Sequence, residues 1–314
     1  NAFKWTLLHN GLTAWACYGV VGISLAYMSY KKGLPLSVRS VLQPLFGKYL
    51  SGGLGHTIDI VAILATIVGL SVTIGYGVSQ FASGLFNITQ FDWLVGENSQ
   101  PTIGAQLLGL LLIIGASCLS AMSGLHKGIK WLSNINMILS LVLILFFMLF
   151  GASVFAFKTF FITIYDYLLA LPEMSFTVWN SNDSEIIGKL QSWQSSWTIF
   201  YWAWWIAFAP FVGIFLARVS KGRTIREYVF GAIIVPSLIC LVWFAFIGGT
   251  AIDLELSGEA QGSIINTDIS NQLFATVNLI TSEGFAATLS VIIVILLLTF
   301  LITSADSGIL IINT

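Results

Sequence analysis

Residues 197–219 read WTIFYWAWWIAFAPFVGIFLARV, and Arg218 carries the only charge in this stretch. A helix that crosses the hydrocarbon core of a bilayer, about 30 Å thick, needs about 20 apolar residues. A water-soluble protein must coat its surface with polar groups, whereas a bilayer accepts apolar side chains on the outside. The stretch therefore predicts a membrane-spanning helix.

The rest of the chain has the same character. Of its 314 residues, 57% are hydrophobic and 9% are charged, against about 25% charged residues in an average soluble domain. The stretches long and apolar enough to span a bilayer are Gly11–Tyr30, Thr57–Phe86, Ile103–Met122, Trp131–Phe157, Trp197–Val219, Tyr228–Ile252 and Gly284–Ser304. They show no strict alternation of apolar and polar residues, which argues against a membrane barrel. The predicted fold class is an all-α polytopic membrane protein.

Basic and acidic residues fall in alternate connections between these stretches. The basic connections follow the first, third and fifth stretches and hold Lys31, Lys32, Arg39, Lys48, Lys127, Lys130, Arg218, Lys221, Arg223 and Arg226. Because Lys and Arg concentrate in cytoplasmic loops, the first stretch is predicted to start outside and the last to end inside. The net charge of -1 gives no indication of nucleic-acid binding.

Lys158–Leu171 (KTFFITIYDYLLAL) is predicted to be too short to span the bilayer. Polar residues lie between its aromatic ones, which fits a helix lying in the membrane interface. The alternative is an ordinary loop with an apolar end.

Aromatic residues form a stripe along the opening stretch. With helical spacing i, i+3, i+4 and i+7, its members are Tyr201, Trp204, Trp205 and Phe208. A rise of 1.5 Å per residue places Trp204 to Phe208 about 10 to 17 Å below the outer start of the helix. Interfacial anchors lie at headgroup level, a position that suits Trp193 and Trp197 but not the deeper rings.

Buried rings are suited to binding a quaternary ammonium ion, which has no N–H donors for hydrogen bonds. Ring faces attract such a bulky cation, contributing about 0.5 to 2 kcal/mol each. The alternative is that these rings only fill the core of the helix bundle. Trp15 and Tyr18 form a second pair on one helix face, which an anchor at the outer interface would also explain.

Two other stretches place oxygen atoms within apolar helices. TFLITSADSG (Thr299–Gly308) has hydroxyl groups that could coordinate Na+ near a helix break. The alternative is hydrogen bonding to their own helix, with Asp306 as a cap or paired with a basic loop. TIVGLSVTIGYG (Thr66–Gly77) is expected chiefly to permit close helix packing, and Asp59 is expected to be solvated.

Several of these motifs resemble the betaine/choline/carnitine transporter family. They include FYWAWWIAFAPFVGIFLARVSKGRTIRE (Phe200–Glu227), VWFAFIGGTAI (Val242–Ile252), FLITSADS (Phe300–Ser307), IDIVAILATIVGL (Ile58–Leu70) and KGIKWLSNINM (Lys127–Met137). The resemblance implies Na+-coupled symport of a quaternary-ammonium osmolyte, such as glycine betaine, choline or carnitine, across the bacterial inner membrane. A sodium-independent exchanger of the same fold is the alternative, followed by a seven-helix receptor suggested by the segment count. An enzyme is not expected, because the histidines show no metal-ligand spacing, and no cofactor is expected.

The resemblance also implies a fold of two inverted five-helix repeats, the LeuT type, of which seven helices would be present. Residues 1–157 would hold the last four helices of the first repeat, and 191–314 the first three of the second. Residues 158–190 would hold the interfacial helix, which implies a homotrimer, and an outer loop. Because the chain begins at Asn1 and stops soon after an apolar run, we expect it to be a piece of a longer protein.

Positions of the family's substrate site match Trp15, Tyr18, Trp204, Trp205 and Phe208. Trp202 lies in the same motif, and Trp197 and Phe200 match outer gates. Asn10 stands where the family usually has a Trp, and the position of Phe208 is often Trp or Tyr, so the resemblance implies a variant substrate site.

The resemblance further implies sodium ligands. Thr303 and Ser304 match hydroxyl ligands, with the Phe300 carbonyl as a third. Thr66 and Phe211 match a second sodium site, in which Leu70 replaces a threonine. That replacement implies either a single sodium ion or a rearranged second site.

Overall fold

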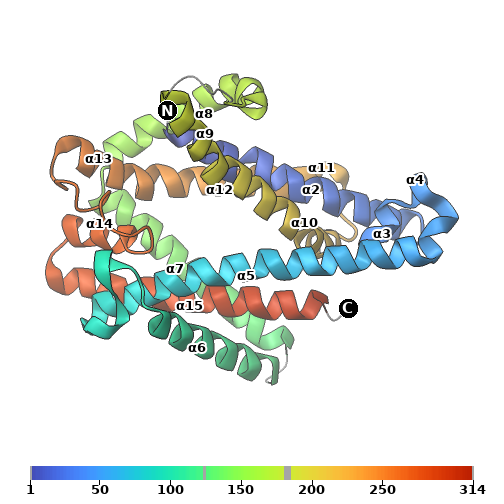
Figure 1. The fold of residues 1–314 in the computed structure, drawn as a ribbon, viewed down its shortest axis with the longest axis horizontal. Helices are drawn as coiled ribbons and strands as arrows, with labels where there is room; N and C mark the ends of the chain where they lie inside the picture. Colours follow the sequence, from blue (N-terminus) through green and yellow to red (C-terminus); the bar gives the residue numbers. More distant parts are fainter. Residues whose placement is uncertain (1, 123–124, 180–184, 313–314) are drawn as a thin grey trace. The chain divides into compact units, whose positions relative to one another are not determined.

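The computed structural model of the chain describes residues 2–122, 125–179 and 185–312. Regular structure in these ranges is helical (Figure 1), apart from an isolated bridge between Val95 and Pro101. The chain forms two compact units, which are described separately. Unit 1 comprises Asn1–Leu70, Phe161–Val242 and Ile311–Thr314; unit 2 comprises Ser71–Phe160 and Trp243–Leu310.

The described residues contain seven helical segments long and apolar enough to cross a membrane. These are Ala2–Lys31, Gly53–Thr89, Lys130–Phe150, Ser153–Phe176, Glu185–Val219, Ile225–Ser257 and Glu283–Gly308, and Ile103–Leu119 is a shorter apolar helix. Large apolar side chains such as Leu111, Leu149 and Val154 are exposed on them. A bilayer would cover these side chains, so the all-α membrane class predicted from the composition is confirmed.

Unit 1 contains α1 (Ala2–Asn10), α2 (Leu12–Ala26), the π-helix η1 (Tyr27–Lys31), α3 (Val38–Val41), α4 (Gln43–Phe46), the 3-10 helix η2 (Gly47–Ser51), the first half of α5 (Gly53–Thr89), most of α8 (Ser153–Phe176), α9 (Glu185–Gln194), the π-helix η5 (Ser195–Ile199), α10 (Phe200–Val219), α11 (Ile225–Val229), the π-helix η6 (Phe230–Ile234) and α12 (Val235–Trp243). The helices α2 and α10 lie side by side (Figure 1).

Glycines allow α2 and α10 to approach closely. A Cβ atom at Gly213 would lie 2.6 Å from Val21 Cγ1, and one at Gly22 would meet the Tyr228 hydroxyl. That hydroxyl donates a 2.9 Å hydrogen bond to the Gly19 carbonyl, which holds α11 against α2. Without a strong hydrophobic force between helices in lipid, such close packing is the main source of their association.

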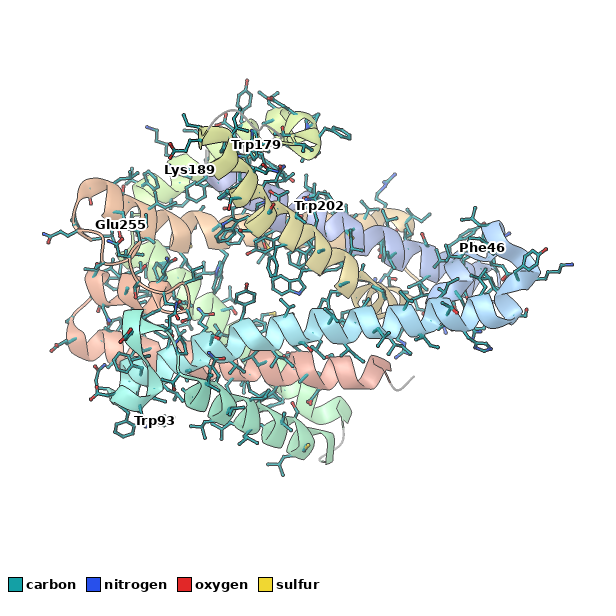
Figure 2. All side chains as sticks on the ribbon, viewed as in Figure 1. Phe46, Trp93, Trp179, Lys189, Trp202 and Glu255 are labelled. Atoms are coloured by element: carbon teal, nitrogen blue, oxygen red, sulfur yellow. The ribbon has the colours of Figure 1, made fainter. Side chains whose placement is uncertain are left out.

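Unit 2 contains the second half of α5, the 3-10 helices η3 (Asp92–Leu94) and η4 (Glu97–Ser99), α6 (Ile103–Met122), α7 (Leu125–Phe150), the start of α8, the π-helix η7 (Phe244–Gly248), α13 (Gly249–Ser257), α14 (Gln272–Ile280) and α15 (Glu283–Ile312). Val78, Ile113 and Leu301 form a buried cluster that joins α5, α6 and α15. Near the end of α13, the carboxylate of Glu255 (Figure 2) accepts hydrogen bonds from the N–H groups of Gly262, Ile264 and Ile265 in the loop that follows.

Two predicted boundaries are wrong. The stretch Trp131–Phe157 is not one helix, because α7 ends at Phe150 and α8 begins at Ser153. Gly151 lies so close to Thr250 that a Cβ would clash, and the Ala152 N–H donates a 3.1 Å hydrogen bond to the Thr250 hydroxyl. This contact with a distant helix stabilises the break.

The helix around 158–171 is also longer than predicted. It runs from Ser153 to Phe176, 24 residues, and is long and apolar enough to cross a membrane. Asp59 is not merely solvated: its Oδ2 lies 2.9 Å from Arg39 Nε. The helix is longer because residues on both sides of 158–171 continue it. Asp59 is paired because Arg39 lies within reach of its carboxylate.

Candidate functional site

A break in the first membrane segment frees buried backbone carbonyls from their hydrogen bonds within the helix. Gly11 separates α1 from α2 with φ -96° and ψ -136°, outside the helical region. The last carbonyls of a helix lack partners within it and need others. The Leu7 carbonyl accepts from the Gly11 N–H at 2.7 Å, and the Leu8 carbonyl accepts from the Thr13 hydroxyl. A Cβ at Gly11 would lie 2.6 Å from the Leu7 oxygen, which explains the glycine.

Trp205 of α10 supplies the hydrogen-bond donor for the carbonyl of His9, the residue after Leu8. Its indole Nε1–H donates a 2.5 Å hydrogen bond to the backbone oxygen of His9. Trp204 binds in a similar way on α5, where its Nε1–H donates to the Gly69 carbonyl at 3.2 Å. A Cβ at Gly69 would lie 2.9 Å from Phe208 Cδ2, so this glycine also makes room for a ring. The two indoles are therefore fixed by backbone groups of two other helices.

The rings of α2 and α10 meet in a ring cluster, which consists of Trp15, Tyr18, Trp204, Trp205 and Phe208. Trp204 and Trp205 are stacked, with centroids 5.3 Å apart and planes inclined by 3°. Tyr18 contacts Trp205 edge to face at 5.5 Å and Phe208 at 6.5 Å. Trp15 contacts Tyr18 at 5.9 Å. The structure thus brings together the aromatic residues that the sequence singled out on separate segments.

Tyr18 has an unusual environment. Its side chain is 3% exposed, and its hydroxyl has no hydrogen-bond partner among the described residues. A buried hydroxyl without a partner costs about 1 to 3 kcal/mol. A ligand oxygen beside Tyr18 would remove that cost.

Further aromatic residues continue from the ring cluster towards the start of α10. His9 stacks on Tyr201 with centroids 5.2 Å apart, and its Nε2 lies 2.9 Å from the Thr198 hydroxyl. Beyond it, the outer tryptophan group consists of Trp5, Trp179 and Trp193, whose ring centroids are 5.4 to 6.0 Å apart.

The Gln194 side-chain oxygen accepts a 3.1 Å hydrogen bond from the backbone N–H of Trp179 (Figure 2), which fixes the backbone there. Sequence reasoning missed His9, Trp5 and Trp179 as neighbours of the site. The available signal was Gly11, which directly follows His9 and Asn10. Glycine often ends a helix, so it indicated a helix end beside these residues.

Other predicted residues have different surroundings. Among the described residues, Trp202 makes no ring contact with the ring cluster, although it lies on the same helix. The Asn10 amide donates to the Thr6 carbonyl at 3.2 Å, within its own helix. Phe200 contacts Trp204 at 5.9 Å, and Trp197 stacks on Tyr201 at 6.2 Å with 38% of its surface exposed.

The predicted sodium ligands are divided between the two units. In unit 1, the Thr66 hydroxyl donates to the Ala62 carbonyl at 2.8 Å, while Phe211 is buried and contacts Phe208. In unit 2, the Thr303 hydroxyl donates to the Phe300 carbonyl at 2.9 Å. Hydrogen bonding to the parent helix, the alternative considered for Thr299–Gly308, is therefore present at Thr303, and Thr66 bonds to its own helix in the same way. Each hydroxyl oxygen keeps a lone pair for a cation.

Polar groups of α7 and α15 meet beside Thr303. Asn136 accepts a hydrogen bond from the Thr299 hydroxyl, and its amide lies 3.5 Å from the Thr303 oxygen. Ser304 is partly buried one residue further along α15. Unit 2 thus holds a set of neutral oxygen atoms, the kind of donor that hard cations prefer.

Comparison with known proteins adds independent evidence. The chain is 39% identical over 308 residues to the glycine betaine transporter OpuD of Bacillus subtilis, covering 98% of this chain and 57% of that protein. It is 38% identical over 309 residues to a glycine betaine/proline/choline transporter of Vibrio parahaemolyticus, covering 98% of this chain and 52% of the relative. The chain spans about half the length of the curated relatives it matches.

A family comparison covers the whole sequence. The profile of the betaine/carnitine/choline family transporters (BCCT) matches residues 1–314. Membership of a transporter family sets aside the enzyme and the seven-helix receptor considered from the sequence. This multi-pass membrane chain belongs to the betaine/carnitine/choline family of transporters.

Proposed function

We propose that the protein carries a small quaternary-ammonium osmolyte across the bacterial inner membrane by Na+-coupled symport. Candidate substrates are glycine betaine and choline, which the names of the relatives include, and carnitine, which the description of the family includes. The observation that carries the proposal is the ring cluster, in which Trp205 and Tyr18 come from different helices and are 5.5 Å apart.

The energies of ring contacts allow a ligand to compete for the same faces. Ring pairs contribute about 0.5 to 1.5 kcal/mol beyond burial, and a desolvated cation–π contact contributes about 2 kcal/mol. A quaternary ammonium ion that contacts two or three rings would therefore gain more than the displaced Trp204–Trp205 stacking provides. A monovalent metal ion keeps a tightly held hydration shell and would gain less from the rings.

The polar groups near the ring cluster would contact the part of the substrate other than its ammonium group. The Tyr18 hydroxyl can donate to a carboxylate, which betaine and carnitine have and choline lacks. Phe208 replaces a larger ring of the family pattern, and Asn10 stands where the family usually has an indole, with its amide donating to the Thr6 carbonyl of α1. We therefore propose a variant site that prefers a zwitterion to a simple cation.

For coupling, we propose that Thr303, Ser304 and the Phe300 carbonyl bind Na+. Thr66 and Phe211 would contribute to a second sodium site, although Leu70 removes one hydroxyl from it. The alternative is a sodium-independent exchanger. No basic residue stands at position 303 or 304, where a fixed positive charge could replace the ion.

The proposed architecture is the LeuT-type inverted repeat, with residues 1–157 in the first repeat and 191–314 in the second. The alternating charges favour an interfacial position for α8, because another crossing between 157 and 191 would place Arg218 to Arg226 outside. An interfacial α8 supports the proposed homotrimer.

Uptake of labelled glycine betaine by cells that express the full-length protein tests this function. With Na+ replaced by K+ outside, symport predicts loss of uptake, whereas an exchanger would keep it. Thr303→Val removes one hydroxyl at nearly constant volume and should raise the Na+ concentration needed for half-maximal uptake about tenfold, the equivalent of one lost cation ligand of about 1.4 kcal/mol. Betaine, carnitine and choline as unlabelled competitors then rank the substrates. A full-length protein that takes up none of the three compounds in labelled form would contradict the proposed substrate class.

A further inference from the structure

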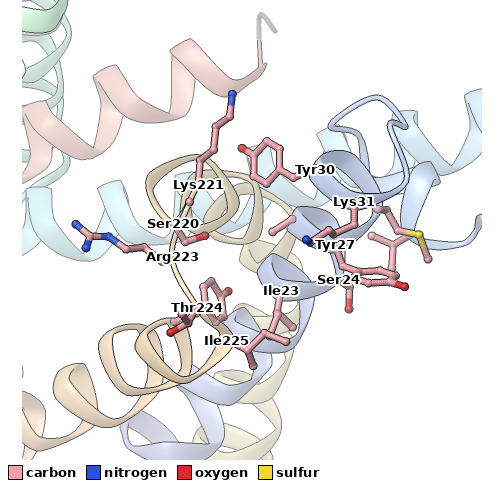
Figure 3. Close-up of a pocket in the computed structure, with 15 residues that line it drawn as sticks. Ile23, Ser24, Tyr27, Tyr30, Lys31, Ser220, Lys221, Arg223, Thr224 and Ile225 are labelled. Atoms are coloured by element: carbon pink, nitrogen blue, oxygen red, sulfur yellow. The ribbon is translucent and has the colours of Figure 1, made fainter.

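A cavity of about 810 Å³ lies at the end of α2 and shares no residue with the ring cluster (Figure 3). The π-helix η1 and the turn between α10 and α11 form its walls. Three of its lining residues are basic: Lys31, Lys221 and Arg223. Ligand pockets have volumes of about 300 to 1,000 Å³, so the cavity can hold a group the size of a phospholipid headgroup.

Lys31 and Lys221 have no salt-bridge partner within the described part of the chain, and Arg223 has only a longer-range charge interaction with Glu227. None of them forms a salt bridge there, whereas Arg39 is paired with Asp59 at 2.9 Å. The Lys221 ammonium lies 5.5 Å from the Tyr30 ring centroid. Glu227 is the carboxylate bound to the same turn, and it accepts hydrogen bonds from the N–H and hydroxyl of Thr224.

Two serine hydroxyls beside the cavity already donate their protons to backbone carbonyls. Ser24 donates to the Val20 carbonyl at 2.7 Å, and Ser220 donates to the Ala217 carbonyl at 3.2 Å. The donors that remain for a bound anion are the Tyr27 and Tyr30 hydroxyls and the Lys and Arg groups, and each Lys or Arg has several N–H donors and no acceptor. Several cations around one cavity suit a group with three or more acceptor oxygens better than a single carboxylate.

We propose that this cavity binds a phosphate group, held mainly by Lys31 and Lys221. Figure 3 shows these two side chains on different walls, with Lys221 beside Tyr30 and Arg223 extending outward from the turn. Arg223 stands at the rim. Ile225, 68% exposed, and Tyr27, 50% exposed, provide apolar contact beside the charges. An anionic phospholipid offers both a phosphate and apolar glycerol and chain groups, and a soluble phosphate offers the charge alone.

The test uses the full-length protein and two double variants that each remove two positive charges. K31Q/K221Q alters the cavity, and K32Q/R226Q alters neighbouring positions that do not line it. In nanodiscs of phosphatidylcholine and phosphatidylglycerol, native mass spectrometry measures how much phosphatidylglycerol each protein retains. In nanodiscs of phosphatidylcholine alone, the rise in Tm caused by inorganic phosphate is compared with that caused by chloride at equal ionic strength.

Each charge near an anionic membrane contributes about 1 kcal/mol, so K31Q/K221Q should reduce retention of phosphatidylglycerol about tenfold or more, and K32Q/R226Q should not. If K31Q/K221Q loses only the Tm rise caused by inorganic phosphate, the ligand is a soluble phosphate. Equal behaviour of the two variants in both arms would overturn the proposal, because binding would then depend on general surface charge. Ile225→Asp, at an exposed position, adds a repelling charge at the mouth and should also reduce binding if K31Q/K221Q fails to fold.

Discussion

The indole N–H of Trp205 and the backbone carbonyl of His9 are joined by a 2.5 Å hydrogen bond between residues 196 positions apart. The bond connects the aromatic face of α10 to the break between α1 and α2. A ligand that shifts the Trp205 ring would therefore also act on the backbone at this break.

The contribution of this hydrogen bond to transport can be measured separately from the contribution of the Trp205 ring. Trp205→Phe keeps an aromatic face but leaves the His9 carbonyl without its donor, which costs about 1 to 3 kcal/mol. Trp205→Leu removes the ring as well. For labelled glycine betaine, we expect KM to rise about tenfold in Trp205→Phe, and uptake to fall below detection in Trp205→Leu. Trp131→Leu, at a position 67% exposed on α7, serves as the control. Equal uptake by the two Trp205 variants would show that the ring face contributes nothing.

Gly22 should be sensitive to the smallest substitution. Gly22→Ala would push the Tyr228 hydroxyl away from the Gly19 carbonyl and crowd the crossing of α2 and α10. Overpacking of this kind costs about 1 to 3 kcal/mol, so Tm in detergent should fall by several degrees. Gly231→Ala is the matched control, because a Cβ there meets no atom within 4 Å. An unchanged Tm in Gly22→Ala would mean that α2 and α10 can move apart without loss of stability, which would contradict the prediction.

Glu255 should control the order of the loop that follows α13. Glu255→Ala removes the acceptor of three N–H groups, those of Gly262, Ile264 and Ile265. Hydrogen bonds to a charged group contribute about 1.5 to 3 kcal/mol, so these amides should exchange about 10 to 100 times faster. Hydrogen exchange of peptides from this loop measures the effect. Glu259→Ala removes an exposed carboxylate of the same loop, and similar exchange in both variants would contradict the assignment.

The two salt bridges within the described residues should differ in coupling energy. Arg39 and Asp59 are 34% and 25% exposed, and the Arg39 N–H also donates to Asp59 at 3.3 Å. A double-mutant cycle with Arg39→Gln and Asp59→Asn should give a coupling of about 1 kcal/mol in the free energy of unfolding. Lys189 and Glu185 are 76% and 83% exposed, so their coupling should be too small to measure. The reverse order would indicate that solvent screening does not govern these pairs.

Much of the fold follows from the sequence because membrane insertion depends on local composition. The apolar runs predicted α5, α6 and α10 closely, since about 20 apolar residues are needed whatever their neighbours are. Helical spacing also placed Trp204, Trp205 and Phe208 on one stripe. The ends of α7 and α8 were wrong because a hydrophobic run does not show a break that a distant residue, Thr250, stabilises.

The sequence by itself determined that this protein is a helical membrane protein, which rings line α10, and which family it belongs to. Only the tertiary structure decided that Trp205 binds the carbonyl of His9, that Trp204 binds Gly69, and that Lys31 and Lys221 line one cavity. The physical reason is the separation along the chain over which each effect acts. Hydropathy and helical period act between neighbours on the chain, whereas ring contacts and bonds to freed carbonyls depend on helices that only folding brings together.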